Sequence, residues 1–206
     1  MVLRGTRNPT RERIQVHRER TYGENGRTTV ENQFEKAWLD RFLALLPLRA
    51  SILDIGCGSA EPIARYVIEK GFCVTGIDSS SRLIAMCKER FPDQVWIDTD
   101  MRSLSLDRRF DGILAWDSFF HLCAEDQRLM FPIFSRHAGP KAALMFTSGP
   151  GAGTAIGSYK GEPLYHRSLD GAEYRSLLNQ NGFDVVSLVV EDPDCGRHTV
   201  WLAQSR

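Results

Sequence analysis

The chain of 206 residues is 42% hydrophobic and 25% charged, and its 26 basic and 26 acidic residues cancel to a formal net charge of zero. This composition is typical of a soluble globular protein with a sizeable core, and the charge balance gives no general attraction to nucleic acid or membranes. No apolar run approaches the roughly 20 residues of a membrane span, and the N-terminus lacks the apolar segment of a secretory signal. Five cysteines, odd in number and without C-x-x-C spacing, predict reduced and mostly buried thiols in a cytoplasmic protein.

The first 47 residues are expected to form an N-terminal helical cap. Residues 1–28 are polar and arginine-rich, which predicts a solvated helix from about Thr10 to Tyr22, with a nucleic-acid-binding arm as the alternative. Over residues 30–46 apolar side chains recur at three- and four-residue spacing, which is typical of an amphipathic helix, and Pro47 ends it.

Strands and helices alternate through residues 48–206, which we expect to form a second domain. Apolar runs predict strands at 52–55, 72–77, 94–97, 110–115, 142–147, 183–190 and 199–203, and the segments between them predict helices at 62–70, 82–91, 125–137 and 170–181. Pro132 should kink or shorten its helix, and the short link between the last two strands makes them antiparallel. The fold class is therefore α/β, a doubly wound, mostly parallel seven-stranded sheet with a C-terminal antiparallel hairpin and helices on both faces.

One long segment fits no element in this pattern. Residues 148–168 are rich in glycine and show no clear periodicity. Loops of this length inside compact domains are usually lids or binding loops, so we expect a functional loop here.

Candidate ligand-binding residues follow the first three strands, because ligands of open α/β sheets bind beyond the carboxyl ends of the strands. The first strand leads into the glycine turn Gly56-Cys57-Gly58. Asp78 ends the second strand twenty residues after Gly58, the offset of a carboxylate that binds ribose hydroxyls; capping the next helix is its alternative role. Asp98 and Asp100 end the third strand, and one of them, Asp100 by preference, could accept a hydrogen bond from an adenine amine while Met101 packs on the ring.

The end of the fourth strand is where a reacting group would lie closest to such a ligand. His121 is the first candidate for a general base there, because imidazole titrates near neutrality, and His166 is the second. Packing or helix capping is the alternative role of His121, and the pair His121-x-Cys123 favours packing over metal binding. Residues that could line a pocket for a second substrate are Tyr22, Trp116, Asp117 and Tyr165.

These motifs together resemble the class I S-adenosylmethionine-dependent methyltransferases, a seven-stranded Rossmann-like family. The resemblance runs from about Val30 to the C-terminus and is carried by Ile52-Leu-Asp-Ile-Gly-Cys-Gly, Val74-Thr-Gly-Ile-Asp, Asp100-Met-Arg-Ser-Leu, Phe110-Asp-Gly-Ile-Leu and the terminal hairpin around Gly182-Phe183. It implies that S-adenosyl-L-methionine is the cofactor. It also implies that the main chain of Gly56, Cys57 and Gly58 holds the methionine portion with Asp54 near its amine. Asp78 and the adjacent Ser79 would then hold the ribose, and Asp100 and Met101 the adenine, with Trp116 also at the cofactor.

The chain departs from the family at Ala60, where a third glycine is usual; an alanine is tolerable there if its φ is negative. The segment Trp116-Asp117-Ser118-Phe119 lacks the Asp/Asn-Pro-Pro-aromatic clasp of enzymes that methylate bases in nucleic acid. We therefore expect methyl transfer to a small-molecule acceptor without a metal. Two alternatives remain, a non-catalytic S-adenosylmethionine-binding protein and an NAD-dependent oxidoreductase. The oligomeric state and the atom that is methylated do not follow from the sequence.

Overall fold

The computed structural model describes residues 34–159 and 162–206. The helix expected from Thr10 to Tyr22, and with it Tyr22 as a pocket residue, lies outside the described residues. Of the helix expected over 30–46, the described part contains α2 (Lys36–Leu43), which buries Trp38, Leu39 and Phe42. No described helix is long and apolar enough to cross a membrane.

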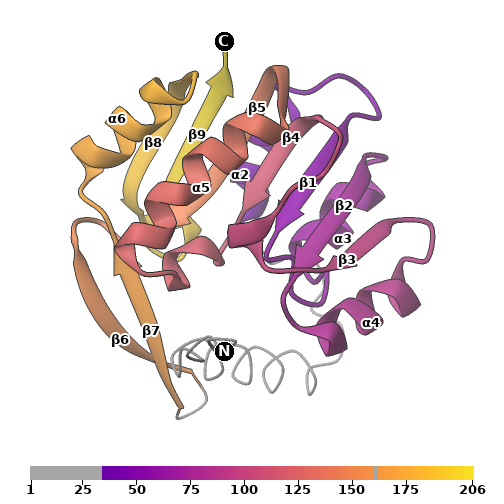
Figure 1. The fold of residues 1–206 in the computed structure, drawn as a ribbon, viewed down its shortest axis with the longest axis horizontal. Coiled ribbons are helices and arrows are strands. Elements are labelled where there is room, and N and C mark those ends of the chain that lie inside the picture. The colour runs from indigo at the N-terminus through magenta and orange to yellow at the C-terminus, as the bar shows by residue number, and fades with distance from the viewer. Residues whose placement is uncertain (1–33, 160–161) are drawn as a thin grey trace, which may run out of the picture.

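A seven-stranded sheet forms the centre of the molecule (Figure 1). Its strands are β1 (Ser51–Ile55), β2 (Cys73–Asp78), β3 (Val95–Asp98), β4 (Phe110–Ala115), β5 (Ala138–Ser148), β8 (Phe183–Asp192) and β9 (His198–Ser205). They lie in the order β3-β2-β1-β4-β5-β9-β8, and β9 runs antiparallel to both β5 and β8 while the other pairs are parallel. The predicted fold class is confirmed, including the antiparallel pair at the C-terminus.

Four further helices connect these strands: α3 (Ile63–Glu69), α4 (Ser81–Arg90), α5 (Ala124–His137) and α6 (Gly171–Gln180). Ser80 caps α4 because its side-chain oxygen accepts a hydrogen bond from the Leu83 N–H. Asp170 caps α6 through the Ala172 N–H in the same way. Gly71 and Gly182 follow α3 and α6 with φ of 87° and 84°, a left-handed conformation that ends a helix and that glycine adopts without strain.

The sheet separates two core clusters, and helices cover one cluster on each of its faces. On one face α5 and α6 enclose a cluster rich in aromatic side chains that includes Phe119, Phe131, Phe146 and Trp201. On the other face α2, α3 and α4 pack against the sheet around Trp38. The layering is therefore helix, sheet, helix, which leaves the carboxyl edge of the parallel strands as the place for a ligand.

Glycines let two aromatic side chains lie directly on the sheet. A Cβ at Gly76 of β2 would overlap the Trp96 ring, and a Cβ at Gly112 of β4 would overlap Phe42 of α2. The missing side chain of Gly76 also gives room to the Cys57 thiol of the glycine turn, whose Sγ would lie 3.0 Å from such a Cβ.

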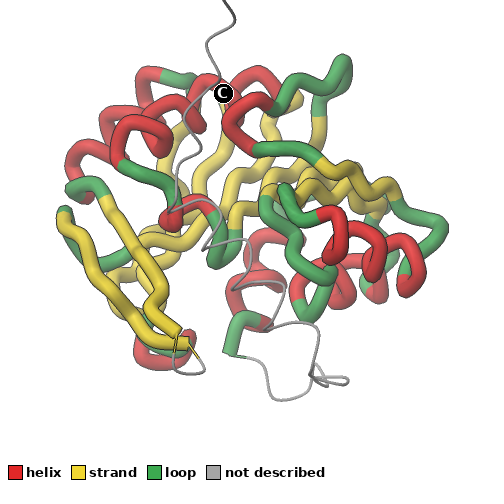
Figure 2. Tube along the Cα trace, turned by 60° about the horizontal axis from the view of Figure 1, so that its bottom comes forward, coloured by secondary structure: helices red, strands yellow, loops and turns green. Residues whose placement is uncertain are grey.

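The segment 148–168 was expected to be a loop, and this prediction is wrong. It contains a β-hairpin of β6 (Gly153–Tyr159) and β7 (Glu162–Ser168), paired in register from Gly153↔Ser168 to Tyr159↔Glu162. The hairpin is a separate two-stranded sheet that extends past the edge of the main sheet (Figures 1 and 2). Its strands escaped the sequence pattern because glycine and polar residues interrupt the alternation of apolar side chains on an element with little core to cover.

Pro132 does not shorten α5, which continues to His137. Three 3-10 turns complete the described elements: η2 (Met101–Ser103), η3 (Phe119–His121) and η4 (Pro193–Cys195). The first two follow β3 and β4 at the carboxyl edge, so they carry several of the candidate site residues.

Candidate functional site

The glycine turn after β1 is fixed to the end of β2 by main-chain hydrogen bonds. The N–H groups of Gly56 and Cys57 both donate to the Ile77 carbonyl, at 2.8 and 2.9 Å. Gly56 and Gly58 have φ of 77° and 58°, so this path needs residues that adopt left-handed backbone. The turn therefore presents main chain rather than side chains at the carboxyl edge.

Asp78 lies at the end of β2 and is only 3% exposed. Its Oδ2 accepts the Gly58 N–H at 3.1 Å and its Oδ1 accepts the Ser80 N–H at 3.0 Å. Ser80, and not Asp78, is the N-cap of α4, so the alternative role considered for Asp78 belongs to Ser80. Ser79 is half-buried beside it, and Asp54 on β1 is 4% exposed.

The Cys57 side chain points into the protein. It is 8% exposed, and Cys87 of α4 lies close enough to share the Gly58 carbonyl, at 3.3 Å from Cys87 Sγ and 3.8 Å from Cys57 Sγ. The contact with Cys87 and burial raise the pKa of the Cys57 thiol. Its sulfur is thus buried away from a ligand at the turn.

Ala60 has φ of 67°, so the condition under which an alanine would be tolerated without strain, a negative φ, is not met. The residue keeps the left-handed backbone that glycine adopts more readily, at a cost of about 1–2 kcal/mol for a side chain with a Cβ. Its methyl group is 1% exposed and belongs to the cluster on the α3 face, so the methyl fills the core rather than an open cavity.

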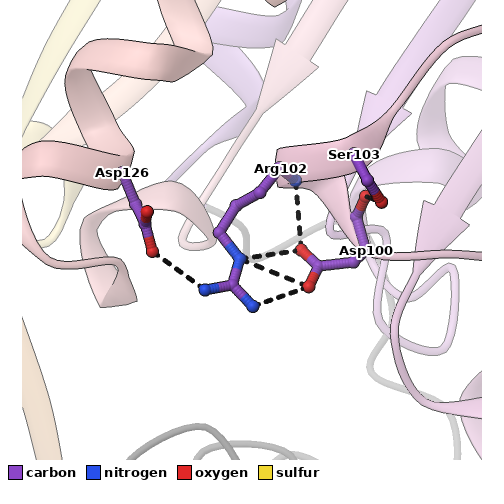
Figure 3. Close-up of polar contacts among 4 residues, drawn as sticks. All are labelled: Asp100, Arg102, Ser103 and Asp126. Carbon is purple, nitrogen blue, oxygen red and sulfur yellow. Dashed lines mark hydrogen bonds and ion pairs between the residues drawn. The ribbon is translucent and has the colours of Figure 1, made fainter. Parts of the chain in front are cut away.

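Asp100 follows β3 and is held by Arg102 (Figure 3). Its Oδ1 accepts the main-chain N–H and Nε–H of Arg102, at 3.0 and 3.1 Å, and its Oδ2 accepts Nη2–H at 2.7 Å. Met101 is half-buried against the α5 face of the core, whereas Asp98 is exposed.

Trp116 and Asp117 come directly after β4, which pairs with β1. The Trp116 ring is 6% exposed, and within the described residues its Nε1 has no hydrogen-bond partner. Asp117 has φ of 43°, a strained conformation that often marks functional sites. Thr147 stabilises it, because its hydroxyl accepts the Asp117 N–H and donates to Asp117 Oδ1.

His198 pairs with Asp117, and sequence reasoning missed it. Its Nδ1 lies 2.8 Å from the Cys195 carbonyl oxygen and its Nε2 lies 3.0 Å from Asp117 Oδ1. Both partners only accept, so both ring nitrogens donate and the ring is an imidazolium. Burial opposes this charge, but the hydrogen bond to Asp117 and its negative charge outweigh burial and raise the pKa of His198 to about 9. The only signal in the sequence was a histidine opening the last strand.

The two candidate bases, His121 and His166, lie together. Their ring centroids are 5.0 Å apart, and the Phe120 ring lies within 5 Å of both. His121 Nδ1 lies 2.8 Å from the Tyr165 carbonyl oxygen, which only accepts, so Nδ1 carries a proton. Burial lowers the pKa of His166, whose Nε2 has no partner among the described residues. Tyr165 itself is half-buried on β7.

A cavity of about 360 Å³ opens between the hairpin and the start of β9. Phe120, His166 and His198 form part of its wall, together with the glycine-rich segment 148–151. Its volume lies within the range of small-molecule sites. The structure thus brings the histidines and the end of β4 to one side of the carboxyl edge, and the glycine turn and Asp78 to the other.

All five cysteines are free, three of them buried. Residues 34–159 and 162–206 contain no group of three or more His, Cys, Asp or Glu side chains that could hold a metal ion.

Comparisons with known proteins agree with this geometry. Residues 52–141 match the model of the methyltransferase domain family. The chain is 34% identical over 80 residues to a dTDP-3-amino-3,6-dideoxy-alpha-D-glucopyranose N,N-dimethyltransferase of Streptomyces fradiae, covering 38% of this chain and 31% of that protein. It is 35% identical over 92 residues to the 27-O-demethylrifamycin SV methyltransferase of Amycolatopsis mediterranei, covering 40% of this chain and 34% of that protein. The chain spans less than half the length of the curated relatives it matches.

A solved structure extends the likeness to nearly the whole chain. The 1,6-didemethyltoxoflavin-N1-methyltransferase of Burkholderia thailandensis, crystallised with its substrate and S-adenosylhomocysteine, superposes with a TM-score of 0.71 at 18% identity over 99% of this chain and 93% of that one. The chain therefore has the fold of the class I S-adenosylmethionine-dependent methyltransferases. Within it, residues 52–141 are the part that matches the methyltransferase domain model.

The described residues fit the cofactor of this class, S-adenosyl-L-methionine. The turn at Gly56 and Gly58 has no Cβ to keep a ligand from the main chain. Asp78 places a buried carboxylate beside that turn. Directly after β4, Trp116 Nε1 is a buried hydrogen-bond donor with no partner within the described part of the chain. This is expected where a ligand completes the hydrogen bonding.

Proposed function

We propose that this protein transfers a methyl group from S-adenosyl-L-methionine to a small-molecule acceptor. The observation that carries the proposal is the pairing of Asp78 with the glycine turn, where a carboxylate 3% exposed accepts the Gly58 N–H at the carboxyl edge of the sheet. The methyltransferase domain match over residues 52–141 supports the same reaction. The bound cofactor would supply an electrophilic methyl group on a sulfonium.

In the proposed site the residues after β1, β2 and β3 hold the cofactor. The main chain of Gly56, Cys57 and Gly58 binds the methionine portion with Asp54 near its amine. Asp78 and Ser79 bind the ribose. Asp100 and Met101 bind the adenine, and the Trp116 ring lies at the end of the cofactor that carries the methyl group. Support comes from the arrangement of these residues along one edge of the sheet.

The acceptor binds on the other side of that edge, in the cavity beside the hairpin. Asp117, which pairs with the lining residue His198, and Tyr165 of the hairpin are proposed to contact the acceptor. Enclosure by the hairpin aligns the acceptor for in-line displacement. The acceptor lone pair forms the new bond to carbon as the carbon–sulfur bond breaks, and the bonding electrons stay on sulfur. The matched relatives named above include an N,N-dimethyltransferase of an amino sugar and a methyltransferase of an O-demethylrifamycin, so the nucleophile here is an amine or a hydroxyl group.

His121 is the base in this proposal. The Tyr165 carbonyl oxygen holds a proton on Nδ1, and in the proposal Nε2 takes up the proton that the acceptor loses. His166 is the second candidate, because burial keeps its ring neutral near pH 7, the residue lines the cavity, and its buried Nε2 has no partner from the described residues.

Five free cysteines support the proposal that the protein works in the reducing cytoplasm. We also propose that residues 1–47 form a helical cap over a catalytic domain of residues 48–206.

Calorimetry with S-adenosylhomocysteine and with NAD tests the cofactor. We expect S-adenosylhomocysteine to bind and NAD not to bind, and Asp78→Ala to weaken binding by about 1–3 kcal/mol, the cost of losing hydrogen bonds to a charged group. Binding of NAD alone would replace this proposal by an oxidoreductase. A methyl-donor turnover assay over a panel of amines and alcohols then tests catalysis, and tight binding without any turnover would favour a non-catalytic binding protein.

A further inference from the structure

Arg102 connects the loop after β3 to the helix α5 through two carboxylates (Figure 3). Its Nε and Nη2 face both oxygens of Asp100, and its Nη1 donates to Asp126 Oδ2 at 2.9 Å. The three side chains are between 19% and 27% exposed, so the group is mostly enclosed. The planar fork of a guanidinium fixes the plane of a carboxylate, which a single contact does not.

The main chain adds a third contact from the same residue. The Arg102 N–H donates to Asp100 Oδ1 at 3.0 Å, which makes Asp100 the cap of η2. The carboxylate is therefore oriented from one side by the backbone and the guanidinium of Arg102.

Asp126 provides the outer anchor of this group. It lies in the first turn of α5, beside Gln127, which is completely buried and donates from its side chain to the Arg167 carbonyl of the hairpin. The orientation of Asp100 thus depends on a core helix as well as on its own three-residue turn. Without Arg102, Asp100 and Asp126 would lose the cation that both of them contact.

We propose that Arg102 is a positioning residue that holds Asp100 toward the 6-amino group of adenine, so that the site selects adenine over hypoxanthine. This inference rests on the proposed function, because it requires the nucleoside of the cofactor at the end of β3. Hypoxanthine has a carbonyl oxygen where adenine has the amine. That oxygen cannot donate to a carboxylate, and a fixed carboxylate repels it.

The test compares two probes, S-adenosylhomocysteine and S-inosylhomocysteine, by calorimetry. We expect the wild-type protein to bind the adenosyl compound at least about tenfold more tightly, the effect of one charged hydrogen bond. Arg102→Met keeps the apolar stem and removes the fork, and we expect this preference to fall about tenfold. Arg102→Lys should restore part of it, since lysine returns the charge without the bidentate geometry.

Two variants separate positioning from a general loss of charge or stability. Asp126→Asn weakens only the outer anchor and should reduce the preference less than Arg102→Met. Arg128→Met, the matched control, removes another α5-linked ion pair, between Arg128 and Glu173, and should leave the preference unchanged. If Arg102→Met does not fold in a thermal melt, Arg102→Lys and Asp126→Asn decide the question.

Equal loss of affinity for both probes in the Arg102 variants would overturn the proposal, because it would make Arg102 a purely structural residue. A wild-type protein that binds both probes equally would also overturn it, while leaving cofactor binding intact. A wild-type protein that binds neither probe would instead contradict the proposed function.

Discussion

Asp117 and His198 are 81 residues apart in the sequence and form an ion pair at the side of the proposed site. The imidazolium lies between two aromatic rings, Phe34 and Trp116, each 5.7 Å away between centroids. It faces two ionisable groups, Asp117 and Glu35, and its Nδ1 bonds the Cys195 carbonyl oxygen. The pair holds the strained Asp117 in place, and its stability must depend on pH.

The sign of that dependence follows from the raised pKa of His198, about 9 against an ordinary 6.5. A histidine that binds its proton more tightly when folded stabilises the protein fully below about pH 6.5 and loses this contribution as the pH rises through 9. Burial raises the pKa of Cys195 to about 12, so this thiol does not titrate in that range.

Urea unfolding of the wild type and of His198→Gln at pH 6.5, 8 and 9.5 measures this effect. We expect the difference in free energy of unfolding between the two proteins to shrink toward pH 9.5. A difference that is constant across the three values would show that His198 is not charged in the folded protein.

At the scale of elements, the hairpin of β6 and β7 is attached at its base by a few side chains. Gln127 donates to the Arg167 carbonyl, His121 bonds the Tyr165 carbonyl, and Ser168 Oγ accepts the Gly149 N–H. Within residues 34–159 and 162–206, these strands pair with each other and not with the main sheet. The hairpin therefore encloses the cavity without supporting the seven-stranded sheet.

Replacing residues 153–167 by two glycines tests this division. Because the base of the hairpin is closed by the pairing of Gly153 with Ser168, we expect the main sheet to fold and S-adenosylhomocysteine to bind within about threefold of the wild-type affinity. Methyl transfer should be lost with the acceptor wall. Gln127→Leu is the control for the anchor, and it should cost about 1–3 kcal/mol by leaving buried polar partners unmet. Loss of cofactor binding in the shortened protein would contradict the division.

The sequence predicted the elements of the main sheet well because each is specified locally. Residues 110–115 were predicted as β4 and form it without change, and the Gly71 and Gly182 helix ends were readable from glycine alone. The strand β5 begins at Ala138, four residues before the expected start, because Ala138 already pairs with Phe110 of β4, ahead of a register shift and of the apolar run. The hairpin of β6 and β7 could not be predicted from the sequence. Its strands are stabilised by pairing with each other more than by a buried apolar face, so they lack the apolar alternation that predicts a strand.

At the scale of the whole molecule, the aromatic cluster under α5 and α6 joins the core to the site. Phe119 is completely buried and contacts Phe131, Phe134, Phe146 and Tyr174 ring to ring. It lies in η3, two residues before His121. The packing of the core therefore determines where the candidate base lies.

We expect Phe119→Ala to lower the free energy of unfolding by about 3–5 kcal/mol, the usual cost of removing a buried aromatic ring. Phe119→Leu, which refills much of the volume, should cost about half as much. Denaturant titration followed by circular dichroism measures both. A cost below about 1 kcal/mol for the alanine variant would show that this cluster does not support the fold as packed.

The sequence alone determined the α/β class, the order of the elements and the glycine turn with its carboxylates, because these depend on local periodicity, turn chemistry and fixed offsets along the chain. It also predicted Asp78 at the end of β2 and Asp100 at the end of β3. Only the tertiary structure decided that Arg102 spans from Asp100 to Asp126, that His198 is charged against Asp117, and that residues 153–168 form a hairpin. Each of these depends on contacts between residues far apart in the chain or on pairing with no buried face, and local sequence does not encode such proximity.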